Sequence, residues 1–239
     1  MSRLTILMYH RVDEIPAETR HFTNFVTPAM FTRQIEALLG WGYEPISFQQ
    51  WLEYRARRAR LPRRPLIVTF DDGYMDFAAN AWPILRRLGV PATVFLVAAK
   101  IGGTNDWDSH EPQTPLLDLA TIHALEAEGV EFGGHGYTHK ALARISPNDA
   151  REELVRCQGA LVSVLSRAPR VLAYPYSNQN AKVRKLAREA GFSCAVRGKG
   201  RLNWRFTDPW GLRRLLMHEA ITPERLRRTL MRLRWLTIT

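Results

Sequence analysis

Short apolar runs recur along the chain and alternate with longer amphipathic segments. The runs are continuous, without polar residues at every second position, which is typical of parallel strands buried on both faces. They predict strands at residues 4–9, 66–70, 92–97, 130–133, 171–174, 192–196 and 212–217, with a weaker strand at 44–47.

The amphipathic segments predict helices. A capping hydroxyl followed by proline marks four helix starts, Thr27-Pro28, Thr114-Pro115, Ser146-Pro147 and Thr222-Pro223. The first of these helices should end near Gly40, and the third should cover residues 147–165. Further helices are expected at 48–58, at 75–88 with a kink or restart at Pro83, and at 180–190.

Seven or eight strand–helix units in one chain favour an α/β barrel. The alternative is an open, doubly wound sheet. In both architectures the functional side chains lie at the carboxyl ends of the strands, and this rule can be applied to each candidate site.

The composition and charge of the chain indicate which kinds of partner it could bind. The 239 residues are 46% hydrophobic and carry a net charge of +11, with a dense arginine cluster in residues 55–64 and a second in 225–235. Each cluster alone is typical of a solvated helix face, but the summed charge favours an anionic partner or membrane surface. No nucleic-acid-binding motif accompanies the charge, so we expect no nucleic acid partner.

The apolar runs are too short to span a membrane, and the one near the N-terminus is too short for a signal peptide. These features predict a cytoplasmic protein, or one peripheral to the membrane. Cys157 and Cys194 give no disulfide framework, and we expect both to be buried thiols.

Two adjacent carboxylates, Asp71 and Asp72, follow the strand at 66–70 and precede Gly73. An Asp-Asp-Gly sequence alone is most often a turn. Burying two like charges costs several kcal/mol per ion unless a cation compensates, and a divalent metal would do so. One carboxylate could then bind the ion while the other acts as a base.

His135 and His139 follow the strand at 130–133 and are four residues apart. On a helical turn this spacing would let both imidazoles bind one ion. Together with the Asp-Asp-Gly turn they give a set of two histidines and one aspartate with open coordination positions, which is typical of a catalytic metal site.

Three segments of the chain together resemble the polysaccharide deacetylase family, carbohydrate esterase family four: "TFDDGYMDFAANAWPILRRLGVPATVFLV", "HGYTH" and "LAYPYS". The resemblance covers nearly the whole chain. It implies a distorted (β/α)7-type barrel, a single catalytic domain over residues 1–239, and metal-dependent removal of acetyl groups from sugars. It assigns Asp71 as the general base and Asp72, His135 and His139 as the metal ligands.

The same resemblance assigns an oxyanion donor and a supporting cation. In "LAYPYS" the backbone N–H of Tyr176, which follows proline, would stabilise the tetrahedral oxyanion. Many family members carry an arginine in this motif and a glycine where Ser177 stands. The "YPY" form resembles the exopolysaccharide branch, which deacetylates poly-N-acetylglucosamine and can take the cation from a late "LRR" pattern. This predicts that Arg214 lies beside Asp71.

Expelling an amine requires a general acid. His218 in "LLMHEA" superficially matches the last family motif, whereas His10 in "LMYHRV" matches the exopolysaccharide branch and lies at a strand end. We favour His10 and leave His218 as the alternative. Trp107 in the long loop after residue 97 is either a platform for a sugar ring or a hydrophobic plug, and Asp208 loosely matches a family residue that supports the site.

These features predict a metal-dependent hydrolase that removes acetyl groups from N-acetylated sugars of a glycan or of a lipid- or nucleotide-linked glycan precursor. Zinc is the expected ion, with nickel or cobalt as alternatives, because this ligand set is not selective. The competing hypothesis is a non-catalytic protein that binds glycans or membrane surfaces on a deacetylase scaffold.

Overall fold

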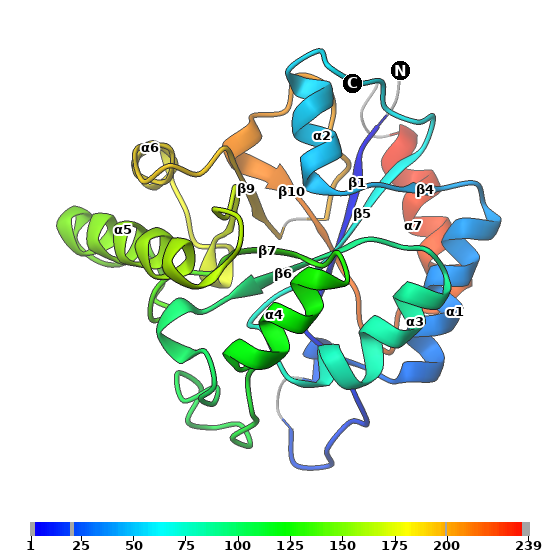
Figure 1. Cartoon of the computed structure of the whole chain (residues 1–239). Coiled ribbons are helices and arrows are strands. Elements are labelled where there is room, and N and C mark those ends of the chain that lie inside the picture. The colour runs from blue at the N-terminus through cyan, green and yellow to red at the C-terminus, as the bar shows by residue number, and fades with distance from the viewer. Residues whose placement is uncertain (1–2, 20–21, 199, 236–239) are drawn as a thin grey trace.

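The computed structural model describes residues 3–19, 22–198 and 200–235 and contains one large parallel sheet (Figure 1). The sheet has the order β10-β9-β8-β7-β6-β5-β1-β11, and β4 pairs with the start of β5. Its strands are β1 (Thr5–Tyr9), β4 (Glu44–Pro45), β5 (Pro65–Phe70), β6 (Ala92–Leu96), β7 (Glu131–Gly134), β8 (Val171–Ala173), β9 (Cys194–Arg197), β10 (Leu212–Arg213) and β11 (Leu215–Leu216). A separate ribbon pairs β2 (Arg11–Val12) with β3 (Phe25–Val26).

The last strand of the sheet closes it into a distorted barrel. β10 and β11 are two pieces of one strand that is interrupted at Arg214. The first piece pairs with β9 and the second with β1, so the two ends of the sheet meet through a single segment. Counting this segment once, and leaving out β4, which pairs only with β5 at the side of this path, gives seven strand positions, and the predicted (β/α)7-type barrel is confirmed.

Helices surround the strands (Figure 1). They are α1 (Pro28–Gly40), α2 (Phe48–Arg55), α3 (Trp82–Arg87), α4 (Leu119–Ala127), α5 (Pro147–Val164), α6 (Ala181–Glu189) and α7 (Pro223–Trp235). Short helical turns lie at η1 (Phe22–Asn24), η2 (Phe77–Ala81), η3 (Ala98–Lys100), η4 (Pro175–Ser177) and η5 (Pro209–Gly211). The helix expected at 75–88 is divided: η2 is a π-helical turn, and α3 restarts around Pro83, as the proline suggested.

One expected helix start is wrong. Thr114-Pro115 does not begin a helix, because Pro115 and Leu116 are extended and bridge Thr104 and Tyr74. Helix α4 begins later, where the Asp118 carboxylate accepts a hydrogen bond from the Thr121 backbone N–H. The starts at Thr27 and Ser146 are confirmed, since each hydroxyl accepts a bond from the first turn.

Side chains alternate between the inside of the barrel and the layer under the helices. Ile6, Ile67 and Val196 pack in one apolar cluster inside the barrel, and Leu7 and Val68 pack in the larger cluster beneath the helices. The same alternation directs Arg214 inward, where its side chain is only 1% exposed. Cys157 and Cys194 are buried free thiols, as expected.

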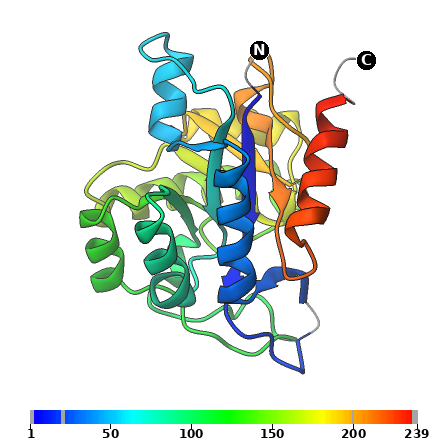
Figure 2. The ribbon, with the colours of Figure 1, turned by 90° about the vertical axis from the view of Figure 1, so that its right-hand side faces the viewer.

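All barrel strands run in one direction, so their carboxyl ends share one end of the molecule. In Figure 2, β1 (blue) runs downward, so the carboxyl ends of the strands face the lower end of the molecule. The cyan segment after α2 lies at the opposite, upper end.

No helix within the described residues is long and apolar enough to cross a membrane. The cytoplasmic location stays a prediction of the sequence.

Candidate active site

Asp71 and Asp72 lie at the carboxyl end of β5 and are buried, with exposed fractions of 3% and 6%. The Asp71 N–H still donates to Tyr9 O at 2.9 Å, which continues the pairing of β5 with β1. The chain then turns through two positive φ angles, 73° at Asp72 and 75° at Gly73. A Cβ at Gly73 would lie 2.8 Å from the Leu96 side chain, so the turn needs glycine there.

The loop after β7 brings both histidines to Asp72. His135 Nε2 and His139 Nε2 lie 3.3 and 3.2 Å from Asp72 Oδ1. One ligand atom from each of the three residues lies within 4.8 Å of the others. The two histidines do not lie on a helical turn: residues 135–139 form a loop, in which Gly136 and His139 have φ of 78° and 65°.

Hydrogen bonding of the two imidazoles fits a cation between them. His135 Nδ1 lies 2.8 Å from the Ala173 carbonyl, which can only accept, so Nδ1 carries the proton. In the neutral ring, Nε2 then directs a lone pair at Asp72 Oδ1, a buried oxygen with no hydrogen-bond partner among the described residues. Two facing lone-pair donors are typical of a metal site, and the ligand set fits a divalent ion.

Charges in the site are strongly coupled. Burial alone would raise the pKa of both carboxyl groups, but Arg214 and His135 lower the pKa of Asp71 below its usual value. The close approach of the His135 and His139 rings, which interact favourably with the charged carboxylate, holds the pKa of Asp72 well below its usual range. Burial alone would lower the pKa of His135, yet Asp71 and Asp72 raise it in the absence of a bound ion. Both carboxyl groups are therefore ionised at neutral pH.

Arg214 contacts Asp71 with both branches of its guanidinium. Nη1 and Nη2 donate to Asp71 Oδ1 and Oδ2 at 2.6 and 2.7 Å. Nη1 also donates to the Thr69 hydroxyl at 3.1 Å, and that hydroxyl donates to Leu7 O. The contact expected from the sequence is present, and the interruption between β10 and β11 is the position from which Arg214 reaches the carboxylate.

Glu153 of α5 holds the histidine loop and was missed by the sequence interpretation. Its side chain is 6% exposed and accepts from the Tyr137 and Thr138 backbone N–H groups at 3.0 and 2.9 Å. The signal was available, because Glu153 lies on the buried stripe of a helix whose other members are apolar or Cys157. A buried acid on such a stripe indicates a specific partner.

Glu153→Met should weaken metal binding by about 10–100-fold, because the loop between the two histidines loses the acceptor of both N–H groups. Chelator competition would measure the metal dissociation constant. Glu152→Met is the matched control, since the Glu152 side chain is the neighbour of Glu153 in the chain but is exposed and pairs with Arg156 on the surface. Equal affinities of the two variants would contradict the positioning role.

His10 and His218 lie in different environments. His10 follows β1, its Nδ1 is buried without a partner among the described residues, and its pKa is lowered by burial against the opposing charges of Asp72 and Asp71. The pKa of His218 is lowered by burial and by Arg225. Its backbone carbonyl accepts from Gln34 of α1. The charges of Asp71 and Asp72 therefore influence the pKa of His10, whereas burial and Arg225 influence the pKa of His218.

Tyr176 and Trp107 both contact His139. The Tyr176 hydroxyl lies 3.1 Å from His139 Nδ1, and the Trp107 and His139 ring centroids are 4.6 Å apart. Tyr176 is 62% exposed, and Trp107 is half-buried. Asp72, His139, Tyr176 and Ser177 all have positive φ, so strained backbone is concentrated at this site.

Asp208 lies away from the carboxylates and histidines of the site. Its carboxylate pairs with Arg184 of α6 at 2.9 Å and accepts a hydrogen bond from the Trp210 backbone N–H at 3.0 Å. Among the contacts of the described residues, none joins Asp208 to Asp71, Asp72 or the two histidines. The structure therefore does not bring the expected supporting residue to the site.

Comparison with known proteins decides the family. The sequence profile described as "Polysaccharide deacetylase" matches residues 58–195, more than half of the chain. The chain belongs to the polysaccharide deacetylase family. The matched segment contains both site carboxylates and both histidines, whereas His10 and Arg214 lie outside it.

The chain is also similar to curated relatives, and its fold is similar to that of solved structures. The chain is 25% identical over 189 residues to poly-beta-1,6-N-acetyl-D-glucosamine N-deacetylase of Staphylococcus epidermidis, covering 71% of this chain and 63% of that protein. Its fold is similar to that of Streptococcus pyogenes deacetylase PplD in complex with acetate, with a TM-score of 0.82 at 21% identity over 95% and 97% of the two chains. A de-N-acetylase from Aggregatibacter actinomycetemcomitans gives a TM-score of 0.83 at 18% identity over 95% and 99%.

The chain spans less than two thirds of the length of the first curated relatives, between 35 and 64%. Their activities describe those longer proteins. The family membership and the barrel are properties of this chain.

Proposed function

We propose that residues 1–239 form one catalytic domain, a metal-dependent N-deacetylase that cleaves the C–N amide bond of N-acetylated sugars in a glycan or glycan precursor. The observation that carries the proposal is the convergence of Asp72, His135 and His139 beside Asp71, whose carboxylate is bound on both oxygens by Arg214. A catalytic base held next to three metal ligands is the arrangement that amide hydrolysis requires.

Each residue has a separate task in this proposal. A divalent ion on Asp72, His135 and His139, best matched by zinc with nickel or cobalt as alternatives, would polarise the acetyl carbonyl and acidify water. Asp71 accepts the proton of the attacking water, and Arg214 keeps that carboxylate ionised and oriented. The Tyr176 backbone N–H donates to the developing oxyanion.

Substrate binding is assigned to the exposed rim. Trp107 and Tyr176 lie against His139 and keep part of their rings accessible, which suits stacking on an N-acetylhexosamine ring. The name of the staphylococcal relative supports β-1,6-linked N-acetylglucosamine polymer as the first substrate to try. A lipid- or nucleotide-linked precursor is the second.

Acetate release from β-1,6-linked N-acetylglucosamine oligomers tests the proposal. The protein should release acetate after loading with zinc, nickel or cobalt, and Asp71→Asn should retain the metal but lose most of the rate. An inactive, fully loaded protein on these oligomers, on chitin oligomers and on UDP-N-acetylglucosamine would instead support the non-catalytic alternative.

His10→Gln should lower kcat on an N-acetyl substrate by about 10²–10⁴-fold, because the leaving amine loses its proton donor. His218→Gln should leave kcat nearly unchanged. The deficit of His10→Gln should shrink on 4-nitrophenyl acetate, whose leaving group needs no protonation. A larger loss in His218→Gln on the N-acetyl substrate would reverse the assignment of the acid.

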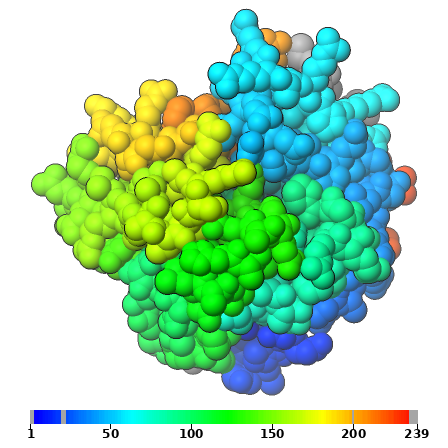
Figure 3. All heavy atoms as spheres, in the orientation of Figure 1, coloured from blue at the N-terminus to red at the C-terminus, as the bar shows by residue number. Residues whose placement is uncertain are grey.

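We propose an anionic membrane surface as a partner of the end opposite the active site. Exposed arginines without an ion pair among the described residues gather there: Arg55, Arg57, Arg58, Arg60 and Arg63. In Figure 3 their segment (cyan) projects from the top of the molecule. Electrostatic attraction to anionic lipid is worth about 1 kcal/mol per basic residue near the surface.

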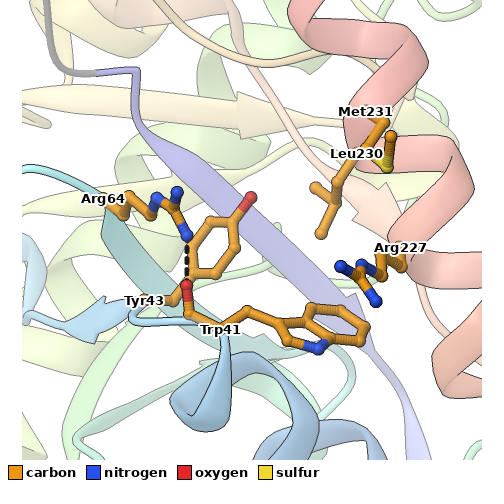
Figure 4. A pocket seen from close by; sticks show the side chains of 6 residues that line it. All are labelled: Trp41, Tyr43, Arg64, Arg227, Leu230 and Met231. Atoms are coloured by element: carbon orange, nitrogen blue, oxygen red, sulfur yellow. Dashed lines mark hydrogen bonds between the residues drawn. The ribbon is translucent and has the colours of Figure 1, made fainter.

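An apolar pocket at α7 could receive lipid chains beside these arginines (Figure 4). It has a volume of about 250 Å³. Its lining residues are Trp41, Tyr43, Arg64, Arg227, Leu230 and Met231. Arg64 donates to the Trp41 carbonyl, so one cation is fixed at the pocket.

Vesicle flotation tests this surface. The protein should float with phosphatidylglycerol vesicles and not with phosphatidylcholine vesicles, and added salt should release it. Replacing Arg57, Arg58 and Arg60 with serine should abolish flotation. The same replacement of Arg86, Arg87 and Arg151 is the control of equal charge, and an equal loss there would show that only net charge matters.

A further inference from the structure

Three arginines from different elements converge on the outer flank of the barrel. Arg184 lies on α6, Arg197 at the end of β9 and Arg213 at the end of β10, and all three line one pocket of about 360 Å³. The remaining lining residues are Trp204, Phe206, Thr207, Asp208 and Gly211. The described part of the β9–β10 connection contains no α-helix, so this face of the barrel lacks the covering that other strands have.

The charges in this pocket are unbalanced. Asp208 is the single acidic residue among the described residues that line it, and its carboxylate pairs with Arg184 at 2.9 Å. Arg197 Nε has a carbonyl partner, Gly211 O, at 3.4 Å. Burial lowers the pKa of Arg197, and the neighbouring charges of Arg213 and Arg184 lower it further. Three positive charges against one negative charge leave an excess of two.

We propose that this pocket binds a monoester phosphate group, either of a soluble phosphomonoester or of a phosphomonoester lipid headgroup. A dianionic phosphate balances the excess charge, whereas one carboxylate would balance half of it. Guanidinium groups from three separate elements suit the several oxygens of phosphate, since each can donate two parallel hydrogen bonds. The volume beyond the arginines leaves room for the group that the phosphate carries, beside Trp204 and the 80% exposed Phe206.

The site is separate from the catalytic one. Arg213 and Arg214 are neighbours in the chain, but Arg214 is directed into the barrel toward Asp71, whereas Arg213 lines the outer pocket. The inference therefore does not rest on the proposed deacetylase activity, and it can be tested in a protein without metal.

Isothermal titration of the Asp72→Ala protein with inorganic phosphate and, separately, with dihexanoyl phosphatidic acid below its micelle concentration tests the pocket. The Asp72→Ala background removes phosphate binding to a metal ion. At constant ionic strength, Arg197→Met and Arg213→Met should each weaken binding at least about tenfold, as expected for a charge-assisted hydrogen bond. Arg87→Met, an exposed arginine of α3, is the control of equal charge.

Gly211→Ala gives a second variant that keeps every charge. A Cβ at Gly211 would lie 3.3 Å from Arg184 Nη1 and 4.0 Å from Arg197 Nε, so it should weaken binding by intruding among the cations. Binding of both probes indicates a soluble phosphomonoester, and binding of the lipid alone indicates a headgroup. Absence of binding for both probes, or equal affinities in the arginine variants and Arg87→Met, would overturn the proposal.

Discussion

Asp72→Ala should lose the proposed metal completely and with it the proposed deacetylase activity. Asp72 Oδ1 lies between His135 Nε2 and His139 Nε2 at 3.3 and 3.2 Å, and it supplies the one negative charge of the ligand set. Two histidines from one loop would remain, and they give too few ligands for a catalytic site, which takes three. Elemental analysis of the purified protein should find near one equivalent of zinc or a similar ion, and none in the variant.

Asp106→Ala is the matched control for this experiment. Asp106 is exposed, pairs with Lys100 and has the same charge, but it lies outside the three-residue cluster. Its metal content should equal that of the unchanged protein. Retention of stoichiometric metal in Asp72→Ala would show that the ligand set is wrong, and absence of metal in both proteins after loading would show that no site forms.

Arg214→Met should destabilise the protein by about 3–5 kcal/mol, because it leaves the buried Asp71 carboxylate without its cation. Arg214 and Asp71 are 1% and 3% exposed, so water cannot replace the lost partner. The activity should also fall steeply, since an unpaired Asp71 takes up a proton more readily and ceases to be a base. Urea unfolding and kcat measure the two effects.

The double variant Arg214→Met with Asp71→Asn separates stability from catalysis. Removing both charges should restore much of the lost stability, because no uncompensated ion remains, while the activity should stay lost. A double variant as unstable as Arg214→Met alone would mean that packing around Arg214, and not the ion pair, carries its contribution to stability.

The strands could be predicted from the sequence because they are buried on both faces. Each barrel strand is covered on both faces, so its residues form a continuous apolar run, and the predicted runs match β1 and β5–β9 within a few residues. Helix starts were predictable where a side chain caps the first turn. Thr114-Pro115 failed because proline also suits extended chain, and the bridge of Pro115 to Thr104 depends on a distant partner.

Which side chains come together in space was harder to predict than the positions of the helices and strands. The four-residue spacing of His135 and His139 suggested a helix, but the positive φ of Gly136 and His139 brings the rings together in a loop. The Arg214–Asp71 contact joins residues 143 positions apart and follows from barrel closure, so only the family resemblance pointed to it. The arginine pocket could not be predicted from the sequence, because its members lie on three separate elements.

The barrel closes only when the interrupted strand at Leu212–Leu216 has been made. The candidate active site therefore cannot be complete before that point of synthesis. Leu7 of β1 pairs with Leu215, so one of the first strands made must wait for the last. At about 5–20 residues per second, this interval is roughly 10–40 s. A nascent chain that has not yet emerged beyond Leu212 has open strand edges at β1 and β9 and no arginine beside Asp71. This species lacks the complete candidate site and is prone to aggregation, and it is the one that a ribosome-associated chaperone would have to shield.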